Sequence, residues 1–133
     1  AFSYYNDNSG NYRFYVRGDG NCYNTNGTYG TISDQKLKEN IVDATPKLDK
    51  VMQLKVRNFN FIGEELKQIG FVAQEFEQVL PDMVEEWRDP APEGEEPYKA
   101  VNANLIPTLV KALQEMKTII DDQAARIAAL EAK

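Results

Sequence analysis

A heptad pattern of apolar residues near the C-terminus constrains the fold of this chain more than any other feature. Large side chains recur at alternating spacings of four and three, with one glutamine among them: Leu109, Leu113, Met116, Ile120, Gln123, Ile127 and Leu130. This spacing predicts one long helix from about residue 104 to about residue 132. Pro107 falls in its first turn, where a missing N–H costs nothing.

Two arrangements of this helix satisfy the pattern. It can lie on the core of its own domain as a single amphipathic helix, or it can project and pack against copies of itself as a coiled coil. We expect the coiled coil, because the stretch from Asp121 to Lys133 has only Ile127 and Leu130 as large apolar residues. The seam does not set the number of strands, since Ile at a with Leu at d favours dimers in simple zippers.

Residues 1–32 differ in composition from the rest of the chain. They are rich in Tyr, Asn and Gly and carry no net charge, so the whole net charge of −6 lies in residues 33–133. Tyr12, Phe14 and Val16 alternate with more polar neighbours, which predicts a strand. Gly18-Asp19-Gly20-Asn21 and Asn26-Gly27 supply residues that favour hairpin turns. We predict short β-hairpins with too few aliphatic residues for a core of their own.

From Ser33 onward the pattern predicts a mixed α and β domain. Thr45-Pro46 is typical of a helix start, with a hydroxyl N-cap before a proline. The sequence then predicts strands over Val56–Ile62 and Lys67–Val72, a helix over Ala73–Leu80, and a strand over Val84–Trp87. Residues 89–97, rich in proline and acid, are expected to form an exposed loop. The predicted fold class is therefore α+β, with hairpins before the mixed domain and a long helix after it.

Composition excludes several classes of site. The chain has no histidine, so neither a Ser-His-Asp triad nor a histidine-ligated zinc site is available, and we expect no metal and no cofactor. A single cysteine, Cys22, cannot form an internal disulfide. The net charge argues against nucleic acid or an anionic membrane as partner. Any nucleophilic chemistry must take its base from Lys, Asp or Glu.

The segment Ser33-Asp34-Gln35-Lys36-Leu37-Lys38-Glu39-Asn40-Ile41 resembles the opening of the intramolecular chaperone domain at the C-terminus of endosialidase tailspikes and many phage tail fibres. Four further matches follow in order. They are Leu48-Asp49-Lys50-Val51 with Leu54, Ile69-Gly70-Phe71-Val72-Ala73-Gln74-Glu75, Pro81 with Val84, and Leu105-Ile106-Pro107. The resemblance divides the chain into residues 1–32, the end of the fibre β-region, and residues 33–133, the chaperone domain.

The resemblance implies a homotrimeric clamp. Three copies hold three upstream fibre chains in register while these fold, and each copy is then released by serine autoproteolysis. It also implies that Ser33 is the nucleophile and Lys38 its general base. A lysine whose pKa is lowered by burial can accept a serine proton at neutral pH. We expect such a protein to act in the cytoplasm of a bacterial host during phage assembly, with the mature fibre on the virion.

Several assignments within this site stay open. Ser33 and Lys36 have the three-residue spacing that places both on one helical face, so Lys36 is a rival base. Ser33 and Lys38 would lie about 140° apart on a regular helix, and can pair only if Ser33 precedes the helix. Asp34 can orient neighbouring groups, and Asn40 can donate to the oxyanion. The expected scissile bond is Ile32–Ser33, with Ser33–Asp34 as the alternative.

Two other functions compete with self-cleavage. A module that is not cleaved can stay on the fibre as a permanent trimerisation cap. The aromatic, Asn-rich residues 1–32 can instead form a receptor-binding tip, since Tyr and Asn favour contacts with sugars.

Overall fold

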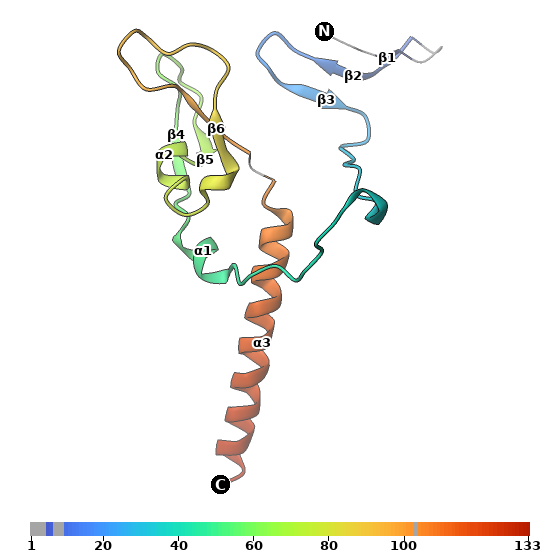
Figure 1. The fold of residues 1–133 in the computed structure, drawn as a ribbon, viewed down its shortest axis with the longest axis vertical. Coiled ribbons are helices and arrows are strands. Elements are labelled where there is room, and N and C mark those ends of the chain that lie inside the picture. Colours follow the sequence, from blue (N-terminus) through green and yellow to red (C-terminus); the bar gives the residue numbers. More distant parts are fainter. Residues whose placement is uncertain (1–4, 7–9, 103) are drawn as a thin grey trace. The chain divides into compact units, whose positions relative to one another are not determined.

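The computed structural model describes residues 5–6, 10–102 and 104–133. The chain divides into two compact units, Ala1–Val42 and Asp43–Lys133. It consists of short antiparallel strand pairs, short helices and one long C-terminal helix (Figure 1). The predicted α+β class is therefore confirmed. The predicted boundary between residues 32 and 33 stays a prediction, since it marks a cleavage position rather than the edge of a compact unit.

The first unit contains a three-stranded antiparallel sheet in the order β1-β2-β3. Its strands are β1 (Tyr5–Asn6), β2 (Tyr12–Val16) and β3 (Cys22–Asn24). Val16 pairs with Cys22 at the turn, where Gly20 adopts a φ of +85° that favours glycine. The Tyr15 ring stacks on the Tyr23 ring at 5.1 Å across the two strands. Asn26-Gly27 also forms a turn, but it follows β3 rather than joining two paired strands, so it is not the hairpin turn that we predicted.

Side chains of the first unit remain accessible to solvent. No residue between 10 and 42 is buried, and the alternating half-buried positions Phe14 and Val16 mark the more covered face of β2. The predicted lack of a private core is therefore confirmed for the part of this unit that the structure describes.

The second unit combines two strand pairs with three helices. The first pair is β4 (Arg57–Phe59) with β5 (Gln68–Gly70), and the second is β6 (Val84–Glu86) with β7 (Lys99–Val101). The helices are α1 (Leu48–Gln53), α2 (Ala73–Phe76) and α3 (Ile106–Glu131), with a 3₁₀ turn at Pro81–Met83. The predicted strands and the helix at 73–80 are present but shorter, and β7 was not predicted.

A small apolar core holds the second unit together. Phe76, Leu80 and Leu105 are its buried members, drawn from α2, the turn after it and the residue before α3. Phe76 is 2% exposed and meets the Phe71 ring edge to face, with ring centroids 4.9 Å apart. The core is therefore built from segments that are distant in sequence.

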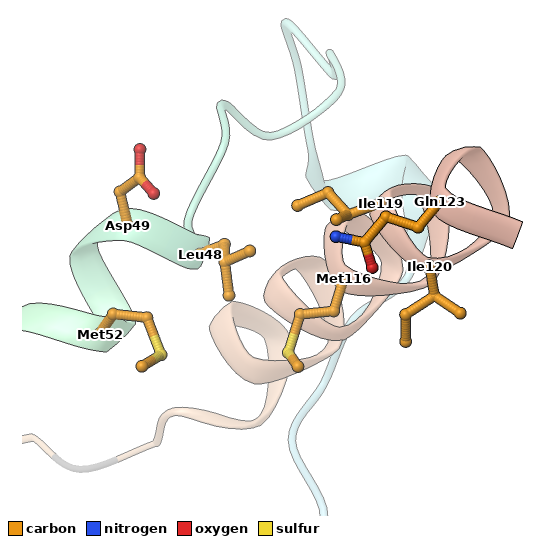
Figure 2. Close-up of a pocket in the computed structure, with 7 residues that line it drawn as sticks. All are labelled: Leu48, Asp49, Met52, Met116, Ile119, Ile120 and Gln123. Atoms are coloured by element: carbon orange, nitrogen blue, oxygen red, sulfur yellow. The ribbon is translucent and has the colours of Figure 1, made fainter. Parts of the chain in front are cut away.

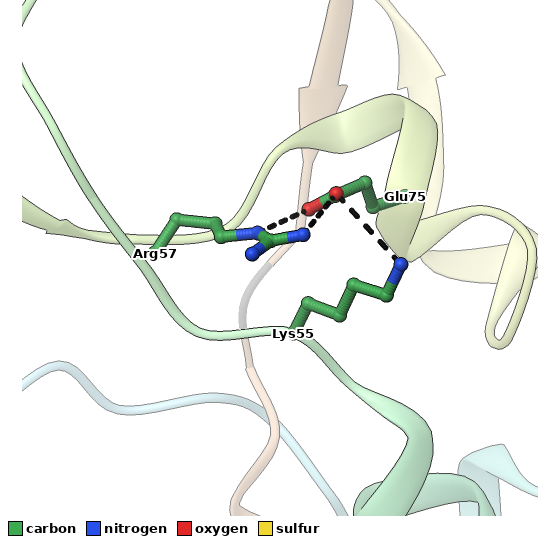
Figure 3. Close-up of polar contacts among 3 residues, drawn as sticks. All are labelled: Lys55, Arg57 and Glu75. Carbon is green, nitrogen blue, oxygen red and sulfur yellow. Dashed lines mark hydrogen bonds and ion pairs between the residues drawn. The ribbon is translucent and has the colours of Figure 1, made fainter.

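An ion pair fastens α2 to β4. Arg57 donates from Nε and Nη2 to the two carboxylate oxygens of Glu75, at 3.0 and 2.6 Å, and Lys55 Nζ lies 4.0 Å from the same group (Figure 3). The hydrogen bonds from Arg57 lower the pKa of the Glu75 carboxyl. This bidentate geometry fixes the orientation of α2 beside the sheet.

The predicted start of the first helix is wrong. Its N-cap is Lys47 rather than Thr45, and no side chain of α1 caps it. Glu115 of α3 caps the helix instead. Its Oε2 accepts hydrogen bonds from the backbone N–H groups of Lys47 and Leu48 at 2.8 and 3.0 Å. The Thr45 hydroxyl accepts from Lys47 Nζ. A carboxylate from a distant helix therefore takes the place of the local hydroxyl.

The long helix α3 presents two different faces. One face is covered by its own unit and contains buried Ala112, with Thr108 and Glu115 half buried. The heptad seam lies one position further along the helix, a rotation of about 100°. Its apolar members are 44% to 66% exposed: Leu109, Leu113, Met116, Ile120, Ile127 and Leu130. The apolar seam residues therefore do not belong to the core of their own unit.

Candidate active site

A single 3₁₀ turn shapes the segment that begins at Ser33. The turn covers Gln35–Leu37, and Asp34 is its N-cap. Asp34 Oδ1 accepts a hydrogen bond from the backbone N–H of Lys36 at 2.8 Å. Lys38 closes the turn by donating its backbone N–H to the Gln35 carbonyl at 3.0 Å. Ser33 therefore precedes the turn and Lys38 follows it.

This arrangement brings the Ser33 and Lys38 side chains together. Lys38 Nζ donates a hydrogen bond to Ser33 Oγ. Ser33 lies before the helical residues, which is the condition that the five-residue spacing requires. Both residues are exposed, whereas we expected a buried lysine. When the amine is neutral, the same contact lets Nζ accept the hydroxyl proton, and the roles of nucleophile and base stay predictions.

Lys36, the rival base, has a different partner. Its Nζ lies 3.8 Å from Asp34 Oδ2, and its side chain is 87% exposed. The described contacts of Ser33 Oγ include Lys38 and not Lys36. The short turn explains this, because the Asp34 carboxylate holds both the backbone and the ammonium group of Lys36.

Asn40 lies two residues beyond Lys38. Its φ of +52° places it in the left-handed region, which Asn tolerates better than most residues. Its exposed side chain follows the turn rather than lying within it. The oxyanion role of Asn40 stays a prediction.

The expected scissile bond lies in exposed chain outside the helices and strands. Ile32 is 79% exposed, and residues 27–34 form no helix or strand. Water and a neighbouring group can therefore reach either peptide bond of Ser33, and the choice between Ile32–Ser33 and Ser33–Asp34 stays a prediction.

A groove between α1 and α3 is a second candidate surface (Figure 2). Its volume is about 370 Å³. Leu48 and Met52 of α1 form one wall, and Met116, Ile119 and Ile120 of α3 form the other. Together with Gln123, the seam residues Met116 and Ile120 therefore belong to both the groove and the heptad pattern.

Metal sites and membrane-spanning helices are the two other features that bear on function. Within residues 5–6, 10–102 and 104–133, no three His, Cys, Asp or Glu side chains are grouped so that they could hold a metal ion. None of the helices described has the length and apolar character needed to cross a bilayer.

Residues 33–85 match the sequence model of a known protein family. They match the peptidase S74 family, described as the chaperone of endosialidase. The match begins at Ser33, so the resemblance stated from the sequence is confirmed over this segment, and it supports a chaperone role. Among curated proteins, the chain has no significant match.

Proposed function

Starting from this family match, we propose that the chain is an intramolecular chaperone that trimerises, holds upstream fibre chains in register and is released by serine autoproteolysis at Ser33. The hydrogen bond between Lys38 Nζ and Ser33 Oγ carries this proposal. It joins two side chains that can perform acyl transfer, at the first residue of the family match. We place this activity in the cytoplasm of a bacterial host during phage assembly.

The proposed reaction transfers one acyl group and then hydrolyses it. The neutral amine of Lys38 takes the hydroxyl proton as Ser33 Oγ attacks the Ile32 carbonyl carbon. The C–N bond breaks, the Ser33 nitrogen takes a proton from the Lys38 ammonium, and an ester joins Ile32 to Ser33 Oγ. Water then hydrolyses this ester, which separates residue 32 from residue 33.

Backbone N–H groups or Asn40 stabilise the oxyanion in this scheme. Asp34 positions the turn that holds Lys38 near Ser33, because its carboxylate accepts the Lys36 N–H. Its proposed role is thus to orient the pair rather than to react.

Assembly is proposed to use the exposed seam of α3. Its apolar side chains would remain in contact with water in a single copy, and a coiled coil buries them. The groove beside α1 extends this surface away from the helix axis. Three strands are proposed from the family resemblance, because the seam residues alone do not select that number.

One experiment tests the proposal as a whole. The chain is expressed with its upstream fibre, with and without Ser33→Ala, and the products are measured by intact mass and by light scattering. We expect the unchanged precursor to give a fragment that begins at Ser33, and Ser33→Ala to remain full length, both as trimers. A full-length trimer from the unchanged precursor would indicate a module retained on the fibre instead.

A seam variant separates assembly from folding. Ile120→Asn should convert the trimer to monomer at micromolar concentration while circular dichroism still shows a folded chain, because Ile120 is 53% exposed in a single copy. Lys117→Gln is the matched control on the same helix. A trimer that is unchanged by Ile120→Asn contradicts the proposed use of the seam.

A further inference from the structure

A second apolar cavity lies in the Asp43–Lys133 unit, apart from the α1–α3 groove. Its volume is about 410 Å³. Phe59 of β4, Phe71 and Val72 after β5, and Val101 of β7 line it, together with Phe61. Ala73 and Lys99 complete the lining. Three aromatic rings from two adjacent segments therefore meet in one open concavity.

The packing around Gly70 keeps this cavity in shape. A Cβ atom at Gly70 would lie 3.3 Å from Cε1 of Phe59, so the ring rests directly over a residue that has no side chain. Phe61 meets Phe59 edge to face at 5.7 Å. Phe61 nevertheless remains 58% exposed. Aromatic surface of this kind, fixed in place and open to water, is typical of a binding site.

An acidic cavity adjoins the aromatic one. It has a volume of about 640 Å³, shares Ala73 and Lys99 with its neighbour, and is also lined by Glu95, Glu96 and Tyr98. Together the two cavities form what we call the composite groove.

Among the described residues, some of the carboxylates around the composite groove are paired with cations, and others are not. Lys99 Nζ lies 2.7 and 2.6 Å from the two carboxylate oxygens of Glu77, and Glu75 is paired with Arg57. Across the described part of the chain, no cation lies in ion-pair contact with Glu95 or Glu96. The composite groove therefore offers apolar rings on one side and uncompensated carboxylates on the other.

We propose that the composite groove binds an unfolded fibre strand with one apolar, aromatic face and an opposite face that carries arginine. The segment Tyr12-Arg13-Phe14-Tyr15-Val16-Arg17 has this chemistry. Consecutive side chains leave an extended strand on opposite sides. A strand that lies along the line where the two cavities meet directs Tyr12, Phe14 and Val16 into the aromatic cavity. Its other face, with Arg13, Tyr15 and Arg17, then points towards the acidic cavity.

Charge favours the same occupant. Residues 12–17 carry two arginines and no acid, whereas residues 33–133 hold the whole net charge of −6. Opposite charge raises the rate of encounter and selects against acidic strands. Once residues 14–16 pair with β3 as they do here, Phe14 is half buried and its backbone is no longer free to bind. The composite groove therefore selects strands that have not yet folded.

This inference rests on the proposed chaperone function, and a labelled peptide tests it. The probe is a fluorescein-labelled peptide with the sequence of residues 11–18, titrated with the full chain carrying Ser33→Ala and followed by fluorescence anisotropy. Phe61→Ser should weaken binding about tenfold or more. Glu95→Gln with Glu96→Gln should weaken it about threefold and flatten its dependence on salt. Ile62→Ser, at the fully exposed next position, is the matched control and should change binding less than twofold.

A benzophenone group on the same peptide locates the contact. We expect cross-links, read by mass spectrometry, within residues 59–73 and 95–101. Equal binding by Phe61→Ser and Ile62→Ser overturns the proposal, as do cross-links elsewhere, or equal binding of a peptide whose aromatic residues are replaced by serine. Cleavage of the unchanged precursor is followed in parallel. Normal cleavage without peptide binding overturns this inference alone, whereas peptide binding without cleavage overturns only the proposed release.

Discussion

The two compact units of this chain are stabilised in different ways. Residues 43–133 enclose Phe76, Leu80 and Leu105, and a carboxylate from α3 caps α1. In the first unit, none of residues 10–42 is buried, and its contacts are strand hydrogen bonds and stacked tyrosines. The Ser33–Lys38 pair lies in the unit without a core. Geometry for chemistry is therefore set there by one 3₁₀ turn rather than by packing.

The two units differ in whether their structure is set by a few neighbouring residues or by packing between distant segments. A capped turn needs only a few residues, so Ser33 and Lys38 can meet without a folded surrounding. The sheet of the first unit has apolar side chains that residues 10–42 leave exposed or half buried, and a short sheet of this kind needs further packing for independent stability.

The largest expected effect is on the rate of cleavage at Ser33, in the first unit. In a precursor with its upstream fibre, Lys38→Ala should reduce the rate of cleavage about a thousandfold, because Ser33 loses its proposed base. Lys36→Ala should stay within about threefold, since Lys36 contacts Asp34. The measurement is the fraction of precursor cleaved with time, by intact mass. Loss of cleavage in Lys36→Ala alone would contradict the assignment of Lys38.

The second effect concerns the core that only one unit has. Phe76→Ala should destabilise the second unit by about 3–5 kcal/mol, measured by urea unfolding, because it removes the most buried side chain. Tyr29→Ala, at a position that is 68% exposed in the first unit, is the control and should change stability by about 0.5 kcal/mol or less. Similar losses from both variants would show that the first unit also depends on a core.

A smaller effect is expected at the cap between α1 and α3. Glu115→Ala should cost about 1 kcal/mol of stability, since two backbone N–H groups at the start of α1 lose their acceptor. Gln114→Ala, one residue earlier and exposed, serves as its control in the same thermal unfolding measurement. If the two variants unfold at the same temperature, the cap does not join the helices.

The smallest effect depends on pH. Hydrogen bonds from Arg57 lower the pKa of Glu75 in the folded chain below its ordinary 4.5. The pair therefore adds stability above that value and loses it as the pH falls through the lowered pKa. Glu75→Gln should have a lower melting temperature than the unchanged chain at pH 7, and the difference should shrink below about pH 4.5. Glu93→Gln in the exposed loop is the control, and a difference that persists unchanged at pH 3 contradicts this role of the pair.

Much of the fold could be predicted from local patterns. The alternation at 12–16, the glycine turns and the seam of α3 are periodic or short-range signals, and the structure contains the corresponding elements. The contact between Ser33 and Lys38 could also be predicted from the sequence, because it required only that Ser33 precede a helical turn. These features depend on residues close together in the sequence.

The sequence did not predict the features that depend on residues far apart in the chain. Glu115 is 68 positions from Lys47, and nothing near Thr45 indicates that a carboxylate from another helix caps α1. The strand β7 is short and follows an acidic loop, so it becomes recognisable only beside β6. The two cavities of the composite groove likewise join residues from three segments, 59–61, 71–74 and 95–101. Tertiary pairing decides such features, and a single sequence does not display it.

The two faces of α3 also have an evolutionary consequence. Ala112 faces the core of its own unit, whereas Leu113, the next residue, faces away and is 66% exposed. With assembly through the seam as proposed, substitutions on the outer face change which chains associate, at little cost to the fold that each chain adopts alone. Where related fibres are made in one cell, such changes would let each chain sort with its own kind. Partner choice can then diverge between lineages while the folded body of the unit stays the same.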